Sequence, residues 1–206
     1  MQLPQLVSRF RSKLTVFRHA DACNHPAVAH PAGETWVLAE PGNIEALFAR
    51  DPALRKHFRQ FLDAGCVGVL LINDGQWVSY GWISTPGGWV PPHLPRWVAK
   101  LGGYWFFHGH TRQAFRGQGC FKRLLARRIG VIKERDPEGA IYVDTDVGNF
   151  ASRRALQSVG FRACGVLITY KLWVPRLGSR VLYGWWSRNE PHPPVPLARR
   201  MGSDAA

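Results

Sequence analysis

The stretch Thr111-Arg-Gln-Ala-Phe-Arg-Gly-Gln-Gly-Cys-Phe-Lys-Arg-Leu-Leu125 decides the fold of this 206-residue chain. An aromatic run, Tyr104 to Phe107, predicts a strand before it, and apolar residues at helical spacing predict a helix after it. Arg116 to Gly119 then form the corner between the strand and the first turn of the helix. Unpaired backbone N–H groups and the positive end of the helix dipole meet at such a corner, which suits a phosphate or a pyrophosphate.

The glycines of this corner have two interpretations. Gly117-Gln118-Gly119 lets a ligand come close to the backbone, but it also fits a plain tight turn from a strand into a helix. The pattern lacks the Gly-Lys-Ser/Thr ending of a Walker A loop and the Gly-x-Gly-x-x-Gly of a dinucleotide-binding fold. The corner alone therefore leaves both interpretations open.

A second segment, further along the chain, resembles part of a known kind of site. Ile141 to Asp144 predicts a short strand, Asn149 is a favourable helix N-cap, and Gly160 is a favourable helix end. The two segments together resemble the GNAT superfamily of acyl-CoA-dependent N-acyltransferases, over about residues 104–172. The family patterns Arg/Gln-x-x-Gly-x-Gly/Ala, Asn-x-x-Ser/Ala and Gly-Phe correspond here to Arg116-Gly117-Gln118-Gly119-Cys120-Phe121, Asn149-Phe150-Ala151-Ser152 and Gly160-Phe161.

The resemblance implies a fold, a co-substrate and the residues that hold it. The fold is α/β (α+β): a mixed, mostly antiparallel central sheet, flanked by helices, whose fourth and fifth strands splay apart in a V. The co-substrate is acetyl-CoA or another acyl-CoA, with its pyrophosphate on the loop and its pantetheine arm in the splay. The residues implied in binding it are Thr111, Arg116, Gly117, Gln118, Gly119, Cys120, Asn149 and Ser152.

Two positions depart from the family pattern. Phe121 stands where the loop usually ends in Gly or Ala. Its ring either crowds the pyrophosphate or, as its helical spacing with Leu124 and Leu125 favours, points into the core. Leu156 stands where many family members have a Tyr that protonates the CoA thiolate. Another group must then protonate the thiolate, or the thiolate leaves unaided, or the protein is not a catalyst.

Histidines at the end of the central strand are the leading candidates for a general base. Strand alternation predicts that Phe106, His108 and His110 share one face. A histidine whose pKa is near neutrality can take the proton that an attacking amine loses. We therefore expect His108 or His110 to be the base, with Asp144 and Asp146 as carboxylate alternatives. The competing interpretation is that both histidines are structural and bind through their ring nitrogens.

The activity that the resemblance implies is the transfer of an acyl group, most simply acetyl, from acyl-CoA to a primary amine. The amine, on a small molecule or a peptide, would attack the thioester directly without an acyl-enzyme. The alternative is a degenerate GNAT-like protein that binds acyl-CoA or a partner, including at a membrane surface, without catalysis.

The chain before residue 104 has an element order compatible with the family. A strand, two helices and a hairpin are followed by a Pro- and Gly-rich loop at residues 85–103, which either covers a substrate or is a plain surface excursion. The predicted elements are Thr35–Ala39, Asn43–Arg50, Pro52–Leu62, Val67–Ile72 and Trp77–Ser84, with a later strand at Cys164–Trp173.

Both ends of the chain are expected to flank a single domain at residues 20–190. Residues 1–19 predict a basic amphipathic helix that either packs on the domain or lies in a membrane interface. Residues 174–188 mix aromatic and basic side chains, which suits a membrane interface, a partner, or a final strand or helix that closes the core. Residues 191–206 predict a disordered, proline-rich tail.

The net charge of +13 favours an anionic partner. Nucleic acid, an anionic membrane, or an anionic cofactor and substrate would each fit, but nucleic acid ranks last because no nucleic-acid-binding motif is evident. The sequence shows no membrane-spanning apolar run, no signal peptide and no Cys-x-x-Cys, which predicts a cytoplasmic protein with reduced thiols. Cys23, His25 and His30 lack the second half of a metal site, so no metal is expected.

Overall fold

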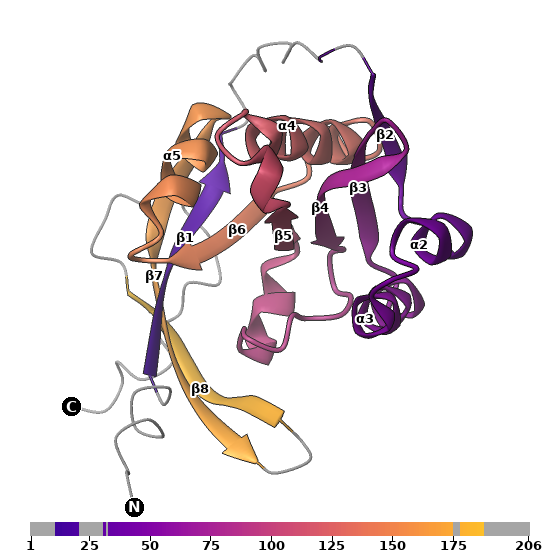
Figure 1. Ribbon diagram of the computed structural model, residues 1–206. Coiled ribbons are helices and arrows are strands. Elements are labelled where there is room, and N and C mark those ends of the chain that lie inside the picture. Colours follow the sequence, from indigo (N-terminus) through magenta and orange to yellow (C-terminus); the bar gives the residue numbers. More distant parts are fainter. Residues whose placement is uncertain (1–10, 21–30, 32, 175–177, 188–206) are drawn as a thin grey trace, which may run out of the picture.

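The structure, a computed structural model, describes residues 11–20, 31, 33–174 and 178–187. Within these residues eight strands form one sheet in the order β2-β3-β4-β5-β6-β1-β7-β8 (Figure 1). Neighbouring strands are antiparallel, except for β5 and β6, which are parallel. The mixed, mostly antiparallel sheet predicted from the sequence is confirmed.

Helices interrupt the strands along the chain and cover the sheet. In chain order the elements are β1 (Arg11–His19), β2 (Glu34–Leu38), α2 (Pro41–Leu47), α3 (Pro52–Asp63), β3 (Val67–Asn73), β4 (Gln76–Ser84), the 3-10 helix η1 (Arg96–Leu101), β5 (Tyr104–Thr111), the 3-10 helix η2 (Gln113–Phe115), α4 (Cys120–Lys133), β6 (Ile141–Asp146), α5 (Phe150–Ser158), β7 (Phe161–Val174) and β8 (Gly178–Ser187). The strands and helices predicted between residues 35 and 84 are confirmed.

Local capping explains where the front helices begin. At the start of α3, the Asp51 side chain accepts a hydrogen bond from the Leu54 N–H at 2.9 Å, and Pro52 follows as the first helical residue. At the start of α2, Glu40 and Asn43 form a capping box. These caps fix both helix starts from short-range sequence alone.

One face of the sheet packs against α4 and α5. Leu124 and Ile129 of α4 and Leu156 of α5 lie in one core with Phe106 and Val143 of the central strands, all of them buried. Figure 1 shows α4 and α5 side by side over this face. This packing places the N-terminal ends of both helices beside the ends of β5 and β6.

The other face carries two further cores. Phe48, the residue after α2, and Phe58 of α3 pack in one core with Trp82 of β4. The loop that contains η1 packs Leu94 against Trp105 of β5. The loop at residues 85–103 is therefore anchored on the face of the sheet opposite α4.

The helix predicted for residues 1–19 is wrong for residues 11–19, which form β1 between β6 and β7. Val16 and Phe17 are fully buried and belong to cores on opposite faces of the sheet. A central strand buries both faces and gains hydrogen bonds on both edges, which outweighs a local helical spacing. The domain therefore begins before residue 20, while residues 1–10 lie outside the described part of the chain.

The last described strand closes the second of these cores. β8 pairs with β7, and the indole N–H of Trp186 donates to the Cys164 carbonyl at 2.9 Å. Of the interpretations considered for residues 174–188, the final strand is confirmed for residues 178–187. The predicted tail at residues 191–206 lies outside the described residues.

Candidate active site

The two parallel strands β5 and β6 separate in the middle of the sheet. Their register ends at Phe106 and Val143. Beyond this point β5 continues along β4 to Thr111, and β6 continues along β1 as far as Asp146. The strands thus open into a V whose apex lies at Phe106 and Val143, and the predicted splay is confirmed.

A bulge at His108 interrupts β5 where the V opens. Trp82 of β4 pairs with Phe107 and Tyr80 pairs with His110, so two residues of β5 stand opposite one residue of β4. His108 itself has φ of 48°, in the left-handed region that few side chains adopt. Such bulges redirect the side chains that follow them.

The bulge overturns the predicted alternation along β5. Phe106 packs with Leu124 on the α4 face, but His108 and His110 lie on the opposite face. There both rings stack on Tyr80, with centroids 5.7 and 5.5 Å away. One extra residue in a strand reverses the face of every residue after it. The histidines share a face with each other, as predicted, but not with Phe106.

Arg128 of α4 occupies the space beneath the bulge. Its side chain is fully buried, lies 3.9 Å from the ring centroid of Phe106, and donates to the carbonyls of Trp82 and Phe107. Among the described residues it has no carboxylate partner, and burial lowers its pKa to about 9. A Cβ on Gly81 would lie 2.8 Å from its Nη1, so this position needs glycine.

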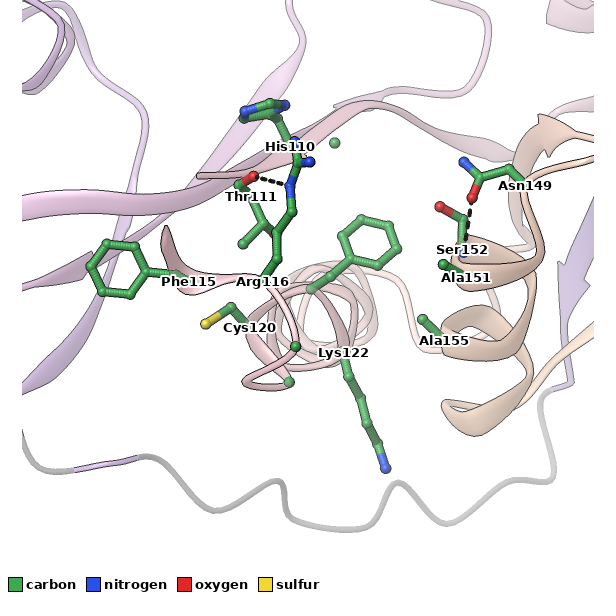
Figure 2. Close-up of a pocket in the computed structure, with 14 residues that line it drawn as sticks. His110, Thr111, Phe115, Arg116, Cys120, Lys122, Asn149, Ala151, Ser152 and Ala155 are labelled. Carbon is green, nitrogen blue, oxygen red and sulfur yellow. Dashed lines mark hydrogen bonds between the residues drawn. The ribbon is translucent and has the colours of Figure 1, made fainter. Parts of the chain in front are cut away.

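A groove of about 560 Å³ opens between the N-terminal ends of α4 and α5. Figure 2 shows His110 and Arg116 on one side of it and Asn149 and Ser152 on the other. Seven of the eight predicted cofactor contacts line the groove: Thr111, Arg116, Gly117, Gly119, Cys120, Asn149 and Ser152. The structure therefore brings together two segments that the sequence keeps about thirty residues apart.

Gly117 and Gly119 give the loop between β5 and α4 its shape. Their φ angles are 77° and 76°, which glycine adopts without strain. A Cβ on Gly117 would meet no protein atom within 4 Å, so this position opens onto the groove. None of the backbone hydrogen bonds found within the described residues has the N–H of Gly117, Gln118 or Gly119 as its donor. These N–H groups can therefore bind a ligand.

A buried ion pair ties this loop to the edge of the sheet. Arg123 of α4 contacts Glu34 of β2 through two hydrogen bonds of 2.7 and 2.6 Å, and the two side chains are 10% and 4% exposed. The same guanidinium donates to the Gln118 carbonyl at 2.8 Å and to the Cys120 sulfur at 3.3 Å. One buried cation thus connects the loop, the first turn of α4 and β2.

Two shorter contacts fold the loop onto the end of β5. Arg116 donates from Nε to the Thr111 carbonyl at 3.3 Å, and Gln118 donates from its side chain to the Ala114 carbonyl at 3.1 Å. The Gln118 side chain is thereby occupied within the loop. It is the one predicted contact that does not line the groove.

Comparison with known proteins identifies this architecture. No protein-family model matches the chain, and no curated protein does. A GCN5-related N-acetyltransferase from Sphaerobacter thermophilus is similar in structure, with a TM-score of 0.53 at 17% identity, over 90% of this chain and 55% of that one. The chain has the GNAT fold.

Two further GNAT structures agree with this assignment. A GCN5-related N-acetyltransferase-like protein from Streptococcus suis gives a TM-score of 0.51 at 14% identity, over 84% of this chain and 63% of that one. A tandem GNAT protein from the clavulanic acid biosynthesis pathway gives 0.52 at 13%, over 88% and 55%. The chain thus spans less than two thirds of the length of these three structures. At such identities the likeness shows the fold.

The two departures from the GNAT sequence pattern have structural consequences. Phe121 packs against the core on the α4 face, as its helical spacing predicts, and its ring also lines the groove. The ring lies 3.1 Å from where a Cβ on Gly109 would stand, so a side chain at this position of the bulge would require the ring to shift. Leu156, in place of the usual Tyr, is buried at 1% exposure and has no polar group to offer a thiolate.

Asn149 caps the helix that follows it, as the local sequence predicts. Its side-chain oxygen accepts a hydrogen bond from the Ser152 N–H at 3.1 Å, which caps α5. The predicted N-cap is confirmed. The capped end of α5 forms the far wall of the groove.

His108 is poorly suited to be the base that the sequence predicted. Its ring lies against Phe58 and Phe61, with centroids 6.0 and 5.5 Å away. His108 is exposed on its solvent side, but desolvation by these rings first, and then the positive charge of His57 and two other histidines, lowers its pKa from 6.5 to about 4. At neutral pH the ring is therefore uncharged and weakly basic.

His110 is the second predicted base and lines the groove. Its ring packs against Trp77 at 6.1 Å as well as on Tyr80. Burial lowers its pKa, and the nearby Arg116 cation lowers it further. Neither His108 nor His110 contacts a carboxylate in the described part of the structure.

Asp144 instead contacts a histidine that sequence analysis did not single out. One carboxylate oxygen of Asp144 accepts from the Trp105 indole N–H at 2.7 Å and lies 3.2 Å from Nε2 of His93. Asp146, the other carboxylate considered, accepts from the Gly148 N–H at 2.8 Å in the turn before α5. The Pro-rich loop was the only sequence signal near His93, because 51 residues separate it from Asp144.

The described residues contain no group of three or more His, Cys, Asp or Glu side chains that could hold a metal ion. Cys23, His25 and His30 lie outside these residues. Within the same part of the chain, no helix is both long enough and apolar enough to cross a membrane.

Proposed function

We propose that the protein is an N-acyltransferase that moves an acyl group, acetyl first among them, from acyl-CoA to a primary amine. One observation carries the proposal: the loop with two left-handed glycines at the start of α4 opens into a groove beside the V between β5 and β6. A backbone cradle for phosphates and a gap between strands thus lie next to each other.

The residues of the groove fit an acyl-CoA. The free N–H groups of Gly117, Gln118 and Gly119 lie at the positive end of α4 and would hold the pyrophosphate. Arg116 and Lys122 line the same groove and place two of the chain's cations beside the pyrophosphate site. The net charge of the whole chain is +13. The pantetheine arm would continue into the V, where the strands have no partner for their inner edges.

The end of β5 would polarise the thioester carbonyl. The Ser79 hydroxyl donates to the His110 carbonyl at 2.7 Å and lies 2.9 Å from the Thr111 hydroxyl oxygen, which fixes this part of the strand against β4. A backbone N–H near His110 or Thr111 would then stabilise the negative charge that develops on the carbonyl oxygen. The amine would attack this carbonyl directly, so no acyl-enzyme forms, and the enzyme supplies orientation.

We take the acceptor to be a small-molecule or peptide amine and the site of action to be the cytoplasm. The direct-attack chemistry requires only a nitrogen with a free lone pair at the V. Both faces of the sheet are packed near the apex, which leaves the open end of the V for the two substrates.

A non-catalytic acyl-CoA-binding protein is the second candidate function. The buried Leu156 favours it, because no hydroxyl at this position can protonate the CoA thiolate. The two candidates share the groove and differ in whether an amine releases CoA from acetyl-CoA.

Thermal unfolding with and without ligand tests the proposal. Acetyl-CoA at about 100 times its dissociation constant should stabilise the protein by about 2.7 kcal/mol, a shift of several degrees. CoA and longer acyl-CoAs, run in parallel, would identify the preferred donor. An unchanged melting temperature with every acyl-CoA would contradict the proposal. Binding without CoA release in an amine screen would favour the non-catalytic candidate.

A further inference from the structure

The side chains at the apex of the V divide between the two faces of the sheet. Phe106 and Val143, the last paired residues, pack toward α4. Trp105 and Tyr142, one residue earlier on each strand, pack on the opposite face. Asp144 follows two residues after Tyr142 in β6, which places it on that same opposite face. The carboxylate therefore lies at the first step beyond the strand pairing, on the side of the sheet away from α4.

Asp144 is held in a fixed position there. Its side chain is only 7% exposed, and the buried Trp105 donates to one of its oxygens at 2.7 Å. His93 approaches the same oxygen with Nε2 at 3.2 Å, and its ring is 36% exposed. A buried carboxylate, fixed by an indole, thus holds a partly exposed imidazole.

This contact decides which nitrogen of His93 is basic. A carboxylate can only accept hydrogen bonds, so in the neutral ring Nε2 carries the hydrogen and donates the hydrogen bond to Asp144. Nδ1 then keeps its lone pair. An imidazole with one nitrogen on a carboxylate and the other free is the arrangement that a general base requires.

The packing of the loop explains why His93 stays in place. Leu94, the next residue, is buried in the core with Trp105. The hydroxyl of Ser84, where β4 ends, donates to the Trp89 carbonyl and closes the start of the loop. His93 is therefore carried by a segment anchored on the same face of the sheet as Asp144.

We propose that His93, oriented by Asp144, is the general base of the acyl transfer. This assignment rests on the function proposed above. The lone pair of the amine forms a bond to the carbonyl carbon, the carbon–sulfur bond breaks, and its electron pair leaves on the CoA sulfur. Before the attack, Nδ1 of His93 takes one proton from the ammonium form of the amine, which frees the lone pair, and passes this proton to solvent. The proton that the nitrogen loses after the attack goes to the sulfur. The negative charge of Asp144 stabilises the imidazolium in between. Asp144 is thus a positioning residue, and His108 and His110 are not the base.

The test compares amines that differ in their need for a base. Release of CoA from acetyl-CoA would be followed with benzylamine, which is protonated at neutral pH, and with trifluoroethylamine, which is not. In His93→Gln we expect kcat/KM for benzylamine to fall by about 100-fold or more. The loss for trifluoroethylamine should be clearly smaller, and the affinity for acetyl-CoA should be unchanged. Added imidazole should restore part of the activity of His93→Ala.

Two variants serve as references. Asp144→Asn keeps the size of the side chain and removes its charge, so we expect a loss of about 10-fold with the same dependence on the amine. His57→Gln changes an exposed histidine of α3 and should retain the wild-type rates. Wild-type melting temperatures in all variants would separate loss of chemistry from loss of folding.

The remaining outcomes overturn the assignment in distinguishable ways. Equal losses for both amines, or wild-type rates in His93→Gln, would show that His93 is not the base. A wild-type protein that binds acetyl-CoA but acylates neither amine would overturn the base assignment and leave acyl-CoA binding intact. A wild-type protein that does not bind acetyl-CoA would overturn the proposed function itself.

Discussion

The two sides of the V are assembled differently: the groove side, where α4 and α5 begin, and the opposite side, where His93 meets Asp144. The groove is built from two short stretches, residues 109–122 and 149–155, and its loop is shaped by its own glycines. The opposite side brings His93 to Asp144 across 51 residues and depends on where a long loop packs. A site made from backbone conformation is thus encoded locally, whereas a site made from side-chain contacts depends on the whole sheet.

The ion pair between Glu34 and Arg123 is a long-range contact that ties the groove side to the edge of the sheet, so breaking it tests the comparison. Glu34→Gln leaves a buried guanidinium without its charge partner, and we expect a loss of about 3 kcal/mol in the free energy of unfolding. The affinity for acetyl-CoA should change by less than about 3-fold, because the glycines rather than the ion pair set the loop conformation. Urea unfolding and calorimetric titration measure the two quantities.

A matched substitution isolates the effect of burial. Glu45→Gln removes a carboxylate that pairs with Arg55 and Arg59, each at 2.6 Å, but whose side chain is 36% exposed. It should cost about 0.5 kcal/mol, as exposed ion pairs do. A large fall in acetyl-CoA affinity in Glu34→Gln would mean that the groove also depends on distant contacts.

This difference between local and long-range contacts explains which features of the site the sequence predicts correctly. The strand at residues 104–111, the N-cap at Asn149 and the glycine corner are short-range signals, and all three are found in the structure. The bulge at His108 has no such signal, because it is fixed by Arg128 filling the space beneath it. The sequence therefore indicates the groove correctly but assigns the histidines to the wrong face.

The buried Arg128 lies between the two sides, and replacing it tests how much this side chain contributes to the stability of the bulge. Arg128→Met leaves two strand carbonyls without a donor, and we expect a loss of about 2 kcal/mol in the free energy of unfolding. Arg127→Met, at the preceding and partly exposed position of α4, removes only a surface ion pair with Glu134 and should change stability by less than about 0.5 kcal/mol. Equal stabilities of the two variants would show that the bulge does not need its buried cation.

His108 gives the smallest expected effect, through the pH dependence of stability. Its pKa is lowered from 6.5 to about 4 on folding, so below pH 6.5 the unfolded chain binds the proton more readily. The neutral ring therefore contributes stability above pH 6.5, and this contribution is lost as the pH falls toward 4. His108→Asn, which tolerates the left-handed backbone, should lose about 1 kcal/mol less than the wild type over this range, allowing for solvent screening.

Urea unfolding at several pH values between 4 and 7 measures this difference. Identical acid losses in the wild type and in His108→Asn would show that the histidine is not desolvated by its aromatic neighbours. His108 would then return as a candidate base, and the contrast between the two sides of the V would weaken.

Two other features are not predicted from the sequence, because they too depend on long-range contacts. Residues 11–19 show helical spacing, yet they form a strand because β6 and β7 are available as neighbours on both edges. His93 has no motif of its own and becomes notable only when the fold brings Asp144 to it. In both cases the deciding contact lies more than fifty residues away, beyond the reach of local patterns.

The most direct measurement of the central claim is the affinity for acetyl-CoA of two matched glycine variants. Gly117 and Gly75 have φ angles of 77° and 72°, and a Cβ at either meets no atom within 4 Å, but only Gly117 lines the groove. Leucine at either position carries a similar backbone strain of about 1–2 kcal/mol. By calorimetric titration, Gly117→Leu should weaken binding by about 100-fold or more, and Gly75→Leu should bind as the wild type does. Equal affinities in the two variants would contradict the claim that this loop is the acyl-CoA site.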